Sequence, residues 1–450
     1  MHLPRLAIGI DFGTTNSSVA LARASAPDQP AVVEFVAFRN PEETITASSR
    51  SILYIEQSKQ RTRSATETFS GFSAIRRYLD RHHTTDTSTS FEPRPGRLIQ
   101  SLKSYLAVRN LTGTEVFGRR YSVEDLIARI VSDLRLATEG HLGTAISPET
   151  PVVVGRPVRF VTAESPEDNV FALARLTSSL ALAGLPNVRF LPEPVAAAFA
   201  YESTLTRDEL ILIGDFGGGT SDFSLVRVGP SMRELLPEQR ILGTAGLGLA
   251  GDAFDAKLVR HLVSPALGSN SMARSLGKNL PAVPAWIYAN LERWHYLSFL
   301  RTRNVDEILR TARLRALEPD KIQALITLID EDLGYQLDQA VQRTKITLSQ
   351  SDHADFIFDE SGLRLHTSVA RSTFESWIAP EITAIEQTID SLLTTTHVTA
   401  QMIDRVFLTG GTSFVPGVRR IFEDRFTPTR VVVGEAFTAV AHGLALHALT

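Results

Sequence analysis

The feature that most constrains this chain is a glycine turn that occurs twice, each time between two apolar runs. The first copy reads Asp11-Phe12-Gly13-Thr14-Thr15, and the second reads Asp215-Phe216-Gly217-Gly218-Gly219-Thr220. An apolar run, a glycine turn and a second apolar run are typical of a β-hairpin. Glycines let the backbone approach a phosphate, threonine hydroxyls add hydrogen-bond donors, and an aspartate at a strand end can hold a hydrated divalent cation. Two such hairpins that face each other are predicted to clamp one nucleotide.

The composition excludes several classes of protein. A chain of 450 residues with 43% hydrophobic residues can bury large cores in about two or three domains. Its net charge of -4 provides no bulk basic surface for nucleic acid or an anionic membrane, and the lack of cysteine rules out disulfides and thiol catalysis. No apolar run approaches the ~18 residues of a membrane span, and Met1–Leu6 leaves no room for the apolar part of a secretion signal. We therefore expect a cytoplasmic protein that binds neither nucleic acid nor membranes.

Strands and helices alternate after the first hairpin. Apolar runs at residues 151–155 and 188–191 predict buried strands. Ser122 precedes a long amphipathic pattern, and Ser165 is followed by a proline and early acidic residues, which is the favoured order at a helix start. The alternation predicts an α/β architecture with a largely parallel sheet behind the hairpin.

The repeated hairpin divides the chain into two predicted domains built on one plan. The first covers residues 1–200 and carries an insertion at about 39–120, and the second covers residues 201–450. Residues 264–366 depart from the repeat and become strongly helical, which predicts a helical insertion in the second domain. The last helix, at about 436–449, is expected to pack back toward the first domain.

Two other patterns are interpreted as structural. His82 and His83 suggest a metal site, but no third ligand with zinc spacing lies near them, so they are interpreted as solvated loop side chains. The aromatic residues from Trp294 to Phe299 fit either a partner surface or a packed core, and core packing of the inserted lobe is the favoured interpretation.

A third glycine turn, Thr409-Gly410-Gly411-Thr412, follows another apolar run. One such turn alone is more typical of a tight hairpin than of a nucleotide site. Three turns together with two strand-end aspartates favour a phosphate site. A protein kinase also uses Asp-Phe-Gly, but the first copy here begins at residue 11 with no lysine strand or catalytic loop before it. The loops that define Walker-type and dinucleotide-binding folds do not occur at the corresponding turns.

The order and spacing of these motifs resemble the ATPase domain of the seventy-kilodalton heat-shock, DnaK-type chaperones, which are members of the actin and sugar-kinase superfamily. The resemblance covers residues 5–450, and within the family the chain is most similar to the YegD-type subgroup. It is carried by Ile8–Ser17, Val153–Phe160, Pro192–Ala198, Asp215–Asp222, Lys345–Ser349 and Leu408–Pro416. The resemblance implies the actin-like ATPase fold, an α/β fold of two duplicated βββαβα domains with a nucleotide cleft and a helical insertion in the second domain.

The resemblance implies ATP or ADP and Mg²⁺ as cofactors, with K⁺ as a further candidate ion. Asp11 and Asp215 would hold the hydrated Mg²⁺ between them. Lys103 would orient the attacked phosphate and water, while Glu193 and Asp222 would complete the polar shell. The implied catalytic residues are therefore Lys103, Glu193, Asp215 and Asp222, and the implied metal ligands are Asp11 and Asp215.

The resemblance also implies nucleotide contacts from both hairpins, from the third glycine turn and from the second domain. The implied contact residues are Gly13, Thr14, Thr15, Asn16, Gly217, Gly218, Gly219, Thr220, Gly251, Lys345, Ser349, Gly410, Gly411, Thr412 and Phe414. The chain departs from the family pattern around the base, because Gln342 and Ile346 stand where the family has glutamate and arginine, and Phe414 stands where it has a second arginine. Two cationic planes that would sandwich the base are thus missing, whereas Phe414 is able to stack on it and Ile346 to pack on its other face.

The expected function is that of a magnesium-dependent, ATP-binding, chaperone-like protein with slow ATP hydrolysis and nucleotide-driven domain closure. Because the chain stops at Thr450, we expect it to lack the peptide-binding domain that follows in a complete chaperone of this family. A nucleotide-gated interaction module without turnover and a small-molecule kinase on the same scaffold are the alternatives, and filament formation is the least favoured. The implied partners are the nucleotide and a protein partner or client.

Overall fold

The computed structural model describes most of the chain. The described residues are 5–24, 31–57, 66–83, 96–202, 204–232, 234–275, 278–292, 297–434 and 436–450. Trp294 and the side chains of His82, His83 and Phe299 lie outside this part, so the two interpretations that involve them stay predictions.

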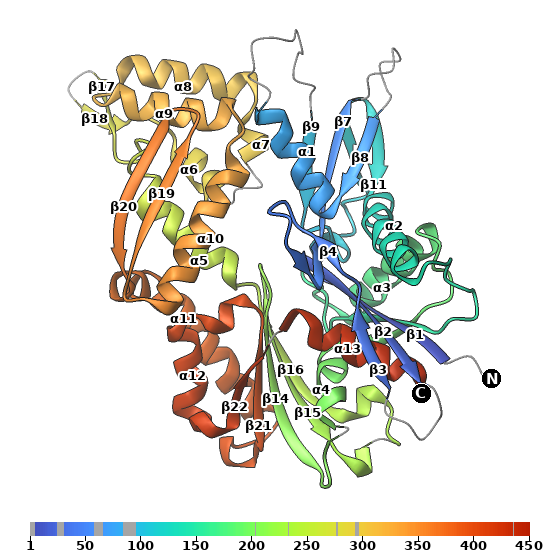
Figure 1. Cartoon of the computed structure of the whole chain (residues 1–450). Coiled ribbons are helices and arrows are strands. Elements are labelled where there is room, and N and C mark those ends of the chain that lie inside the picture. The colour runs from blue at the N-terminus through green and yellow to red at the C-terminus, as the bar shows by residue number, and fades with distance from the viewer. Residues whose placement is uncertain are drawn as a thin grey trace. The chain divides into compact units, whose positions relative to one another are not determined.

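The chain forms two compact units (Figure 1). The first comprises Met1–Gly248, Gln387–Ser413 and Arg420–Thr450, and the second comprises Leu249–Glu386 and Phe414–Arg419. Both large sheets belong to the first unit, so compactness by itself does not divide the chain at residue 200. That division stays a prediction.

The first large sheet has the strand order β13-β12-β1-β2-β3, with β6 added to β2. Its strands β1 and β2 form the first predicted hairpin, and β12 and β13 run parallel to β1. The bounds are β1 (Arg5–Phe12), β2 (Asn16–Ala24), β3 (Val32–Phe35), β6 (Ser48–Arg50), β12 (Val152–Arg156) and β13 (Arg189–Pro192). The parallel strands lie where the apolar runs predicted them.

Helices cover both faces of this sheet, which explains why its central strands are apolar on both sides. On one face, Ile8 and Ile10 of β1 join a core that includes buried residues of α2 (Val123–Leu142) and α3 (Pro166–Leu182). On the other face, the last helix α13 (Ala436–Leu449) lies across β1 and β2, as Figure 1 shows. The contact is close because its residues are small, and a Cβ placed on Gly9 would lie 2.3 Å from the backbone nitrogen of Ala445.

The second large sheet repeats the plan with the order β16-β15-β14-β21-β22. Its strands β14 and β15 form the second predicted hairpin, and β21 and β22 run parallel to β14. The bounds are β14 (Glu209–Phe216), β15 (Ser221–Val228), β16 (Ile241–Leu247), β21 (Arg405–Thr409) and β22 (Val431–Val433). In each copy, three antiparallel strands are followed by helix, strand, helix, strand and helix. The closing elements are α2, β12, α3, β13 and α4 (Glu193–Glu202) in the first copy, and α11 (Arg371–Thr395), β21, α12 (Pro416–Phe426), β22 and α13 in the second.

The two predicted helix starts are confirmed by their caps. The Ser122 hydroxyl accepts a hydrogen bond from the backbone N–H of Asp125, whose carboxylate accepts one from the N–H of Ser122. Ser165 and Asp168 form the same reciprocal pair at the start of α3. Each pair satisfies backbone donors that the first helical turn leaves without partners.

A segment between β3 and α2 adds a smaller subdomain to the first copy. Its three-stranded sheet has the order β8-β7-β9, and a 3₁₀ helix, η1 (Leu102–Tyr105), follows β9. The remaining bounds are β4 (Phe38–Arg39), β5 (Ile45–Thr46), β7 (Ile52–Gln57), β8 (Thr66–Ser70), α1 (Gly71–His83), β9 (Gly96–Gln100), β10 (Gly113–Val116) and β11 (Arg119–Ser122).

The second unit contains several helices and two β-hairpins, and the division into a domain with a helical insertion stays a prediction. Its elements are α5 (Gly251–Leu258), β17 (Met272–Ser275), β18 (Lys278–Pro281), α6 (Ala285–Leu291), α7 (Leu297–Leu300), α8 (Arg303–Arg315), α9 (Pro319–Asp330), α10 (Gly334–Gln350), β19 (His353–Glu360) and β20 (Leu363–Ala370). The hairpin of β19 and β20 was not anticipated. Its signal is a strict alternation in which Ala354, Phe356 and Phe358 are buried and their neighbours exposed. None of the helices in the described part of the chain is long and apolar enough to cross a membrane.

Candidate functional site

Each hairpin places an aspartate at the end of its first strand, beside a tight turn. Asp11 is the last residue but one of β1 and lies opposite Ser18, and Asp215 is the last residue but one of β14 and lies opposite Asp222. The first turn requires glycine, because a Cβ on Gly13 would lie 2.2 Å from the carbonyl oxygen of Asn16. Both turns therefore form as the glycine motifs predicted.

A buried ion pair in the site joins two segments that are far apart in the sequence. The ammonium Nζ of Lys103 donates to Oε1 of Glu193 at 2.7 Å, and the two side chains are only 8% and 16% exposed. Lys103 lies in η1, where its neighbours Leu102 and Leu106 are buried in the core of the first sheet. Glu193 begins α4 directly after β13. The pairing of β13 with β12, and of β12 with β1, brings Glu193 to the same sheet edge as Asp11.

The site holds more acidic groups than basic ones. Burial raises the pKa of Asp11 to about 7, the charges of Glu193 and Asp215 add to that rise, and Lys103 opposes it. Burial raises the pKa of Asp222 to about 7 as well, with a contribution from the charge of Asp215. Burial also raises the pKa of Asp215. Desolvation works against the ammonium of Lys103, but Glu193 and Asp11 outweigh it, so the pKa of Lys103 is raised and the group stays charged.

This donor set fits a hydrated Mg²⁺. Buried carboxylates that repel one another gain most from a divalent cation, and Mg²⁺ is commonly held by one or two carboxylates while it keeps several waters. Among the described residues, no group of three or more acidic or histidine side chains is placed to cage an ion directly. A cavity with about 50 Å³ of space for water borders Glu193, Asp215, Asp222 and Thr409, enough for a few ordered waters.

The third glycine turn contacts the second hairpin. The hydroxyl of Thr409 donates to Oδ1 of Asp215 at 2.7 Å, since parallel pairing places these residues side by side. Gly410 has a positive φ of 89°, and a Cβ there would lie 1.9 Å from the carbonyl oxygen of Phe216. Thr409 was not among the predicted site residues, although its place just before a glycine turn at a strand end was a signal for it.

The second unit holds a separate cluster around α10. Lys345 lies 2.8 Å from the carboxylate of Asp255 on α5, and the amide of Gln342 donates to the same carboxylate at 2.6 Å. Burial raises the pKa of Asp255, while Lys345 lowers it. The hydroxyl of Ser349 donates to the carbonyl of Lys345 in its own helix. Asp255 was missed from the sequence, where its only signal was its place on the helix after the Gly251 turn.

The predicted site residues thus fall into two groups. The first unit holds both hairpins, the third turn and the charged centre: Asp11, Gly13, Thr14, Thr15, Asn16, Lys103, Glu193, Asp215, Gly217, Gly218, Gly219, Thr220, Asp222, Gly410, Gly411 and Thr412. The second unit holds Gly251, Lys345, Ser349 and Phe414. Phe414 is 53% exposed and Ile346 is 55% exposed, so both apolar side chains are accessible on this unit.

Known proteins match this chain over nearly its whole length. The model of the Hsp70 protein family matches residues 7–275 and 321–449. A mitochondrial heat shock 70 kDa protein of Solanum tuberosum is 26% identical over 98% of this chain and 54% of its own length. The chaperone protein dnaK1 of Synechocystis is 25% identical over 94% of this chain and 51% of its own length, and a chaperone protein dnaK of Thalassiosira pseudonana is 25% identical over 86% and 58%. The chain therefore spans about half the length of these relatives.

The family match and the duplicated sheets confirm the predicted α/β, actin-like ATPase fold. The first matched range includes both predicted hairpins, and the second includes the third glycine turn. The chain belongs to the Hsp70 family.

Proposed function

We propose that this chain binds ATP with Mg²⁺ and hydrolyses it slowly, as a chaperone-like ATPase of its family. The observation that carries the proposal is the buried Lys103–Glu193 pair, which lies among the strand-end carboxylates of both hairpins. A buried excess of carboxylates around one cation is costly for a purely structural core. It suits a site that receives a polyphosphate and a divalent ion.

The residues of the chain would divide the chemistry among them. Bound Mg²⁺ would neutralise phosphate charge, with Asp11 and Asp215 holding its waters. The ammonium of Lys103 would stabilise charge that develops on the γ-phosphoryl oxygens. Asp222, whose pKa is about 7, suits a general base that takes the proton of the attacking water as the bond from the γ-phosphorus to the bridging oxygen breaks, releasing ADP and phosphate.

The turns would bind the phosphates through their backbone. The first hairpin would contribute Thr14 and Thr15 as donors, and the second would contribute the N–H groups of Gly218 and Gly219. In the second unit, the ammonium of Lys345 is engaged by Asp255, so the accessible Phe414 and Ile346 would supply most of the surface for the base.

The wider role follows from the family. We propose a cytoplasmic protein whose domains close on ATP and which presents a different surface to a protein partner or client in each nucleotide state. Within the family, the Gly155-Arg156-Pro157 motif supports the YegD-type subgroup.

Single-turnover hydrolysis tests the proposal. With protein in excess over Mg²⁺-ATP, Lys103→Ala should lower the rate about 10²- to 10³-fold. Lys257→Ala is the matched control, because Lys257 is also a partly buried lysine paired with a glutamate, Glu381, at 2.9 Å. Equal rates in the wild type and Lys103→Ala would remove Lys103 from the mechanism.

A second candidate is a nucleotide-gated interaction module without turnover. It is favoured by the apolar, accessible Phe414 and Ile346, which replace the charged residues of the family pattern. In this case the wild type would bind Mg²⁺-ATP and release no phosphate in a single-turnover experiment. Binding of ATP and ADP with equal affinity, combined with no turnover, would contradict this candidate too.

A further inference from the structure

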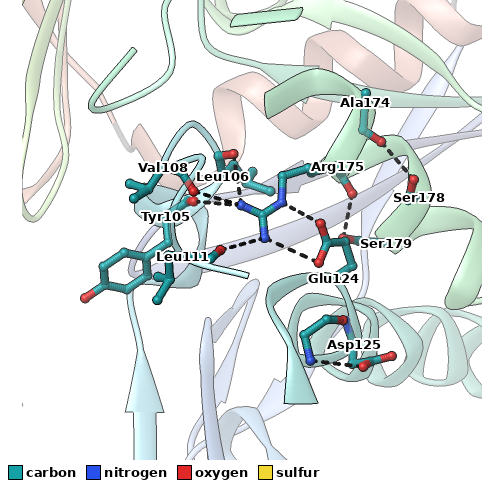
Figure 2. Close-up of polar contacts among 11 residues, drawn as sticks. Tyr105, Leu106, Val108, Leu111, Glu124, Asp125, Ala174, Arg175, Ser178 and Ser179 are labelled. Carbon is teal, nitrogen blue, oxygen red and sulfur yellow. Dashed lines mark hydrogen bonds and ion pairs between the residues drawn. The ribbon is translucent and has the colours of Figure 1, made fainter. Parts of the chain in front are cut away.

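A buried arginine on α3 contacts the segment that carries Lys103. The guanidinium of Arg175 donates to the backbone carbonyls of Tyr105, Leu106, Val108 and Leu111 at 3.2–3.4 Å (Figure 2). Its side chain is only 7% exposed. All four carbonyls follow Lys103 by two to eight positions in the chain.

The geometry suits an arginine better than a lysine. The short turns after Lys103 give the carbonyls of Tyr105 and Val108 one backbone partner each, the N–H groups of Val108 and Leu111, and a carbonyl can accept a second hydrogen bond. A planar guanidinium has five donors in a fixed fork, whereas a lysine ammonium is a single point of charge with three. Arg175 donates to these four carbonyls, three of which share the hydrogens of one terminal nitrogen, and it also donates to both carboxylate oxygens of Glu124 on α2.

Glu124 makes this burial possible. An unpaired cation at this depth would be costly, and a hydrogen-bonded carboxylate offsets that cost. Burial works to raise the pKa of Glu124, but its hydrogen bond from Arg175 and other contacts bring the pKa below the usual range, so the partner is ionised at neutral pH. The pair therefore ties α2, α3 and residues 105–111 together.

The contact of Arg175 with residues 105–111 lies next to Lys103 in the chain. Leu102 and Leu106 hold the Lys103 segment in the core on one side, and Arg175 holds the backbone just beyond it on the other. The chain of α3 continues through β13 directly to Glu193, the partner of Lys103. Arg175 thus contacts the segment that carries Lys103, and it belongs to the helix that leads to Glu193.

We propose that Arg175 is a positioning residue for Lys103: it clamps residues 105–111 to α3 so that the ammonium of Lys103 is held at Glu193 and at the phosphate site. The inference rests on the proposed function for its effect on hydrolysis, but not for its effect on the placement of Lys103. Among the described residues, Arg175 forms no hydrogen bond or ion pair with the charged centre or the turns, so it acts through the backbone.

The test compares Arg175→Met with a matched arginine between the same helices. Arg135 on α2 donates to the carbonyl of Ala183 at the end of α3 and pairs with Glu139, but it does not contact residues 105–111 in any recorded interaction. Arg175→Met should lower the single-turnover rate at saturating ATP at least tenfold and change the Kd for ATP less than threefold. Arg135→Met should leave both within twofold, and Arg175→Lys should be intermediate. Equal rates in Arg175→Met and Arg135→Met would overturn the inference.

A second measurement is independent of hydrolysis. Acylation of the Lys103 amine in the nucleotide-free protein, followed by mass spectrometry, should be slow in the wild type and in Arg135→Met because this amine is buried. It should be at least fivefold faster in Arg175→Met. A wild type without turnover would contradict the proposed function alone, whereas unchanged acylation in folded Arg175→Met would overturn the inference alone. If Arg175→Met does not fold, Arg175→Lys and Glu124→Gln carry both measurements, with the same directions expected and unchanged values again overturning the inference.

Discussion

The two hairpins have one backbone plan and different side chains. In each, a strand-end aspartate precedes a glycine turn and pairs across the hairpin with the residue seven positions later. That residue is Ser18 in the first hairpin and Asp222 in the second. The positions after the first glycine are Thr14 and Thr15 in one copy and Gly218 and Gly219 in the other.

The polar side chains around the two hairpins also differ. The first hairpin is lined with hydroxyls, and the buried pair of Ser17 and Ser51 joins it to the chain after β6 at 2.8 Å. The second is lined with carboxylates, where Thr220 donates to Asp222 at 3.1 Å and Thr409 donates to Asp215. The comparison indicates that the two copies share one backbone plan and differ by substitution. The first hairpin carries hydrogen-bond donors, and the second carries charged carboxylates.

Loss of the aspartates should have the largest effect on this comparison. Asp215→Ala should abolish Mg²⁺-dependent nucleotide binding, because Asp215 lies among the carboxylates of the second hairpin and also orders Thr409. Asp11→Ala should reduce the binding by a similar factor if the two hairpins share one ion. Calorimetric titration of ATP with Mg²⁺ and with a chelator measures both effects. Tight metal-dependent binding by Asp215→Ala would contradict the site.

The next largest effect is expected at the residue opposite the strand-end aspartate, which is Asp222 in the second hairpin and Ser18 in the first. Asp222→Asn should lower the single-turnover rate about 10²-fold, because an amide cannot accept the proton of water. Ser18→Ala, at the equivalent position, should change the rate less than threefold and cost about 1 kcal/mol of stability, since Ser18 is a buried hydroxyl. Comparable losses of rate in the two variants would mean that the hairpins do not divide the roles.

The glycines that begin the two turns should respond unequally. A Cβ on Gly13 would lie 2.2 Å from a backbone oxygen, whereas one on Gly217 would lie 3.4 Å from the oxygen of Thr220. Gly13→Ala should therefore destabilise the protein by about 1–3 kcal/mol, and Gly217→Ala by less than about 1 kcal/mol. Urea unfolding of both variants checks the order, and a larger loss in Gly217→Ala would contradict it.

The dependence on pH follows from the buried carboxylates of both hairpins. The folded-state pKa values of Asp11 and Asp222 lie above the ordinary value of 3.8, so the stability that these groups contribute to the ligand-free protein is present below about pH 4 and is lost as the pH rises through about 7. Protons compete with the cation over the same range. The apparent Mg²⁺ affinity should be about tenfold weaker at pH 6 than at pH 8 for each carboxylate that must ionise. Asp222→Asn should reduce this dependence, and an unchanged pH profile in that variant would place the titration elsewhere.

Features that depend on neighbouring residues could be predicted from the sequence alone. The two hairpins, the parallel strands behind them and the capping boxes at Ser122 and Ser165 were predictable because turn chemistry, apolar runs and helix caps act within a few residues. The hairpin of β19 and β20 had the same kind of signal, since its alternation is local. Candidate residues such as Asp11 and Asp215 were identified for that reason.

Which side chains meet depends on how the whole chain folds. Lys103 and Glu193 are 90 positions apart, Asp255 and Lys345 are also 90 apart, and Thr409 is 194 positions from Asp215. The pairs form because parallel strands align their ends and because helices pack on the same core, and no local pattern encodes either event. Arg175 shows the limit most clearly. It lies on the buried face of α3 with Ala172, Leu176 and Ser179, and only the fold reveals the four backbone carbonyls that accept its hydrogen bonds.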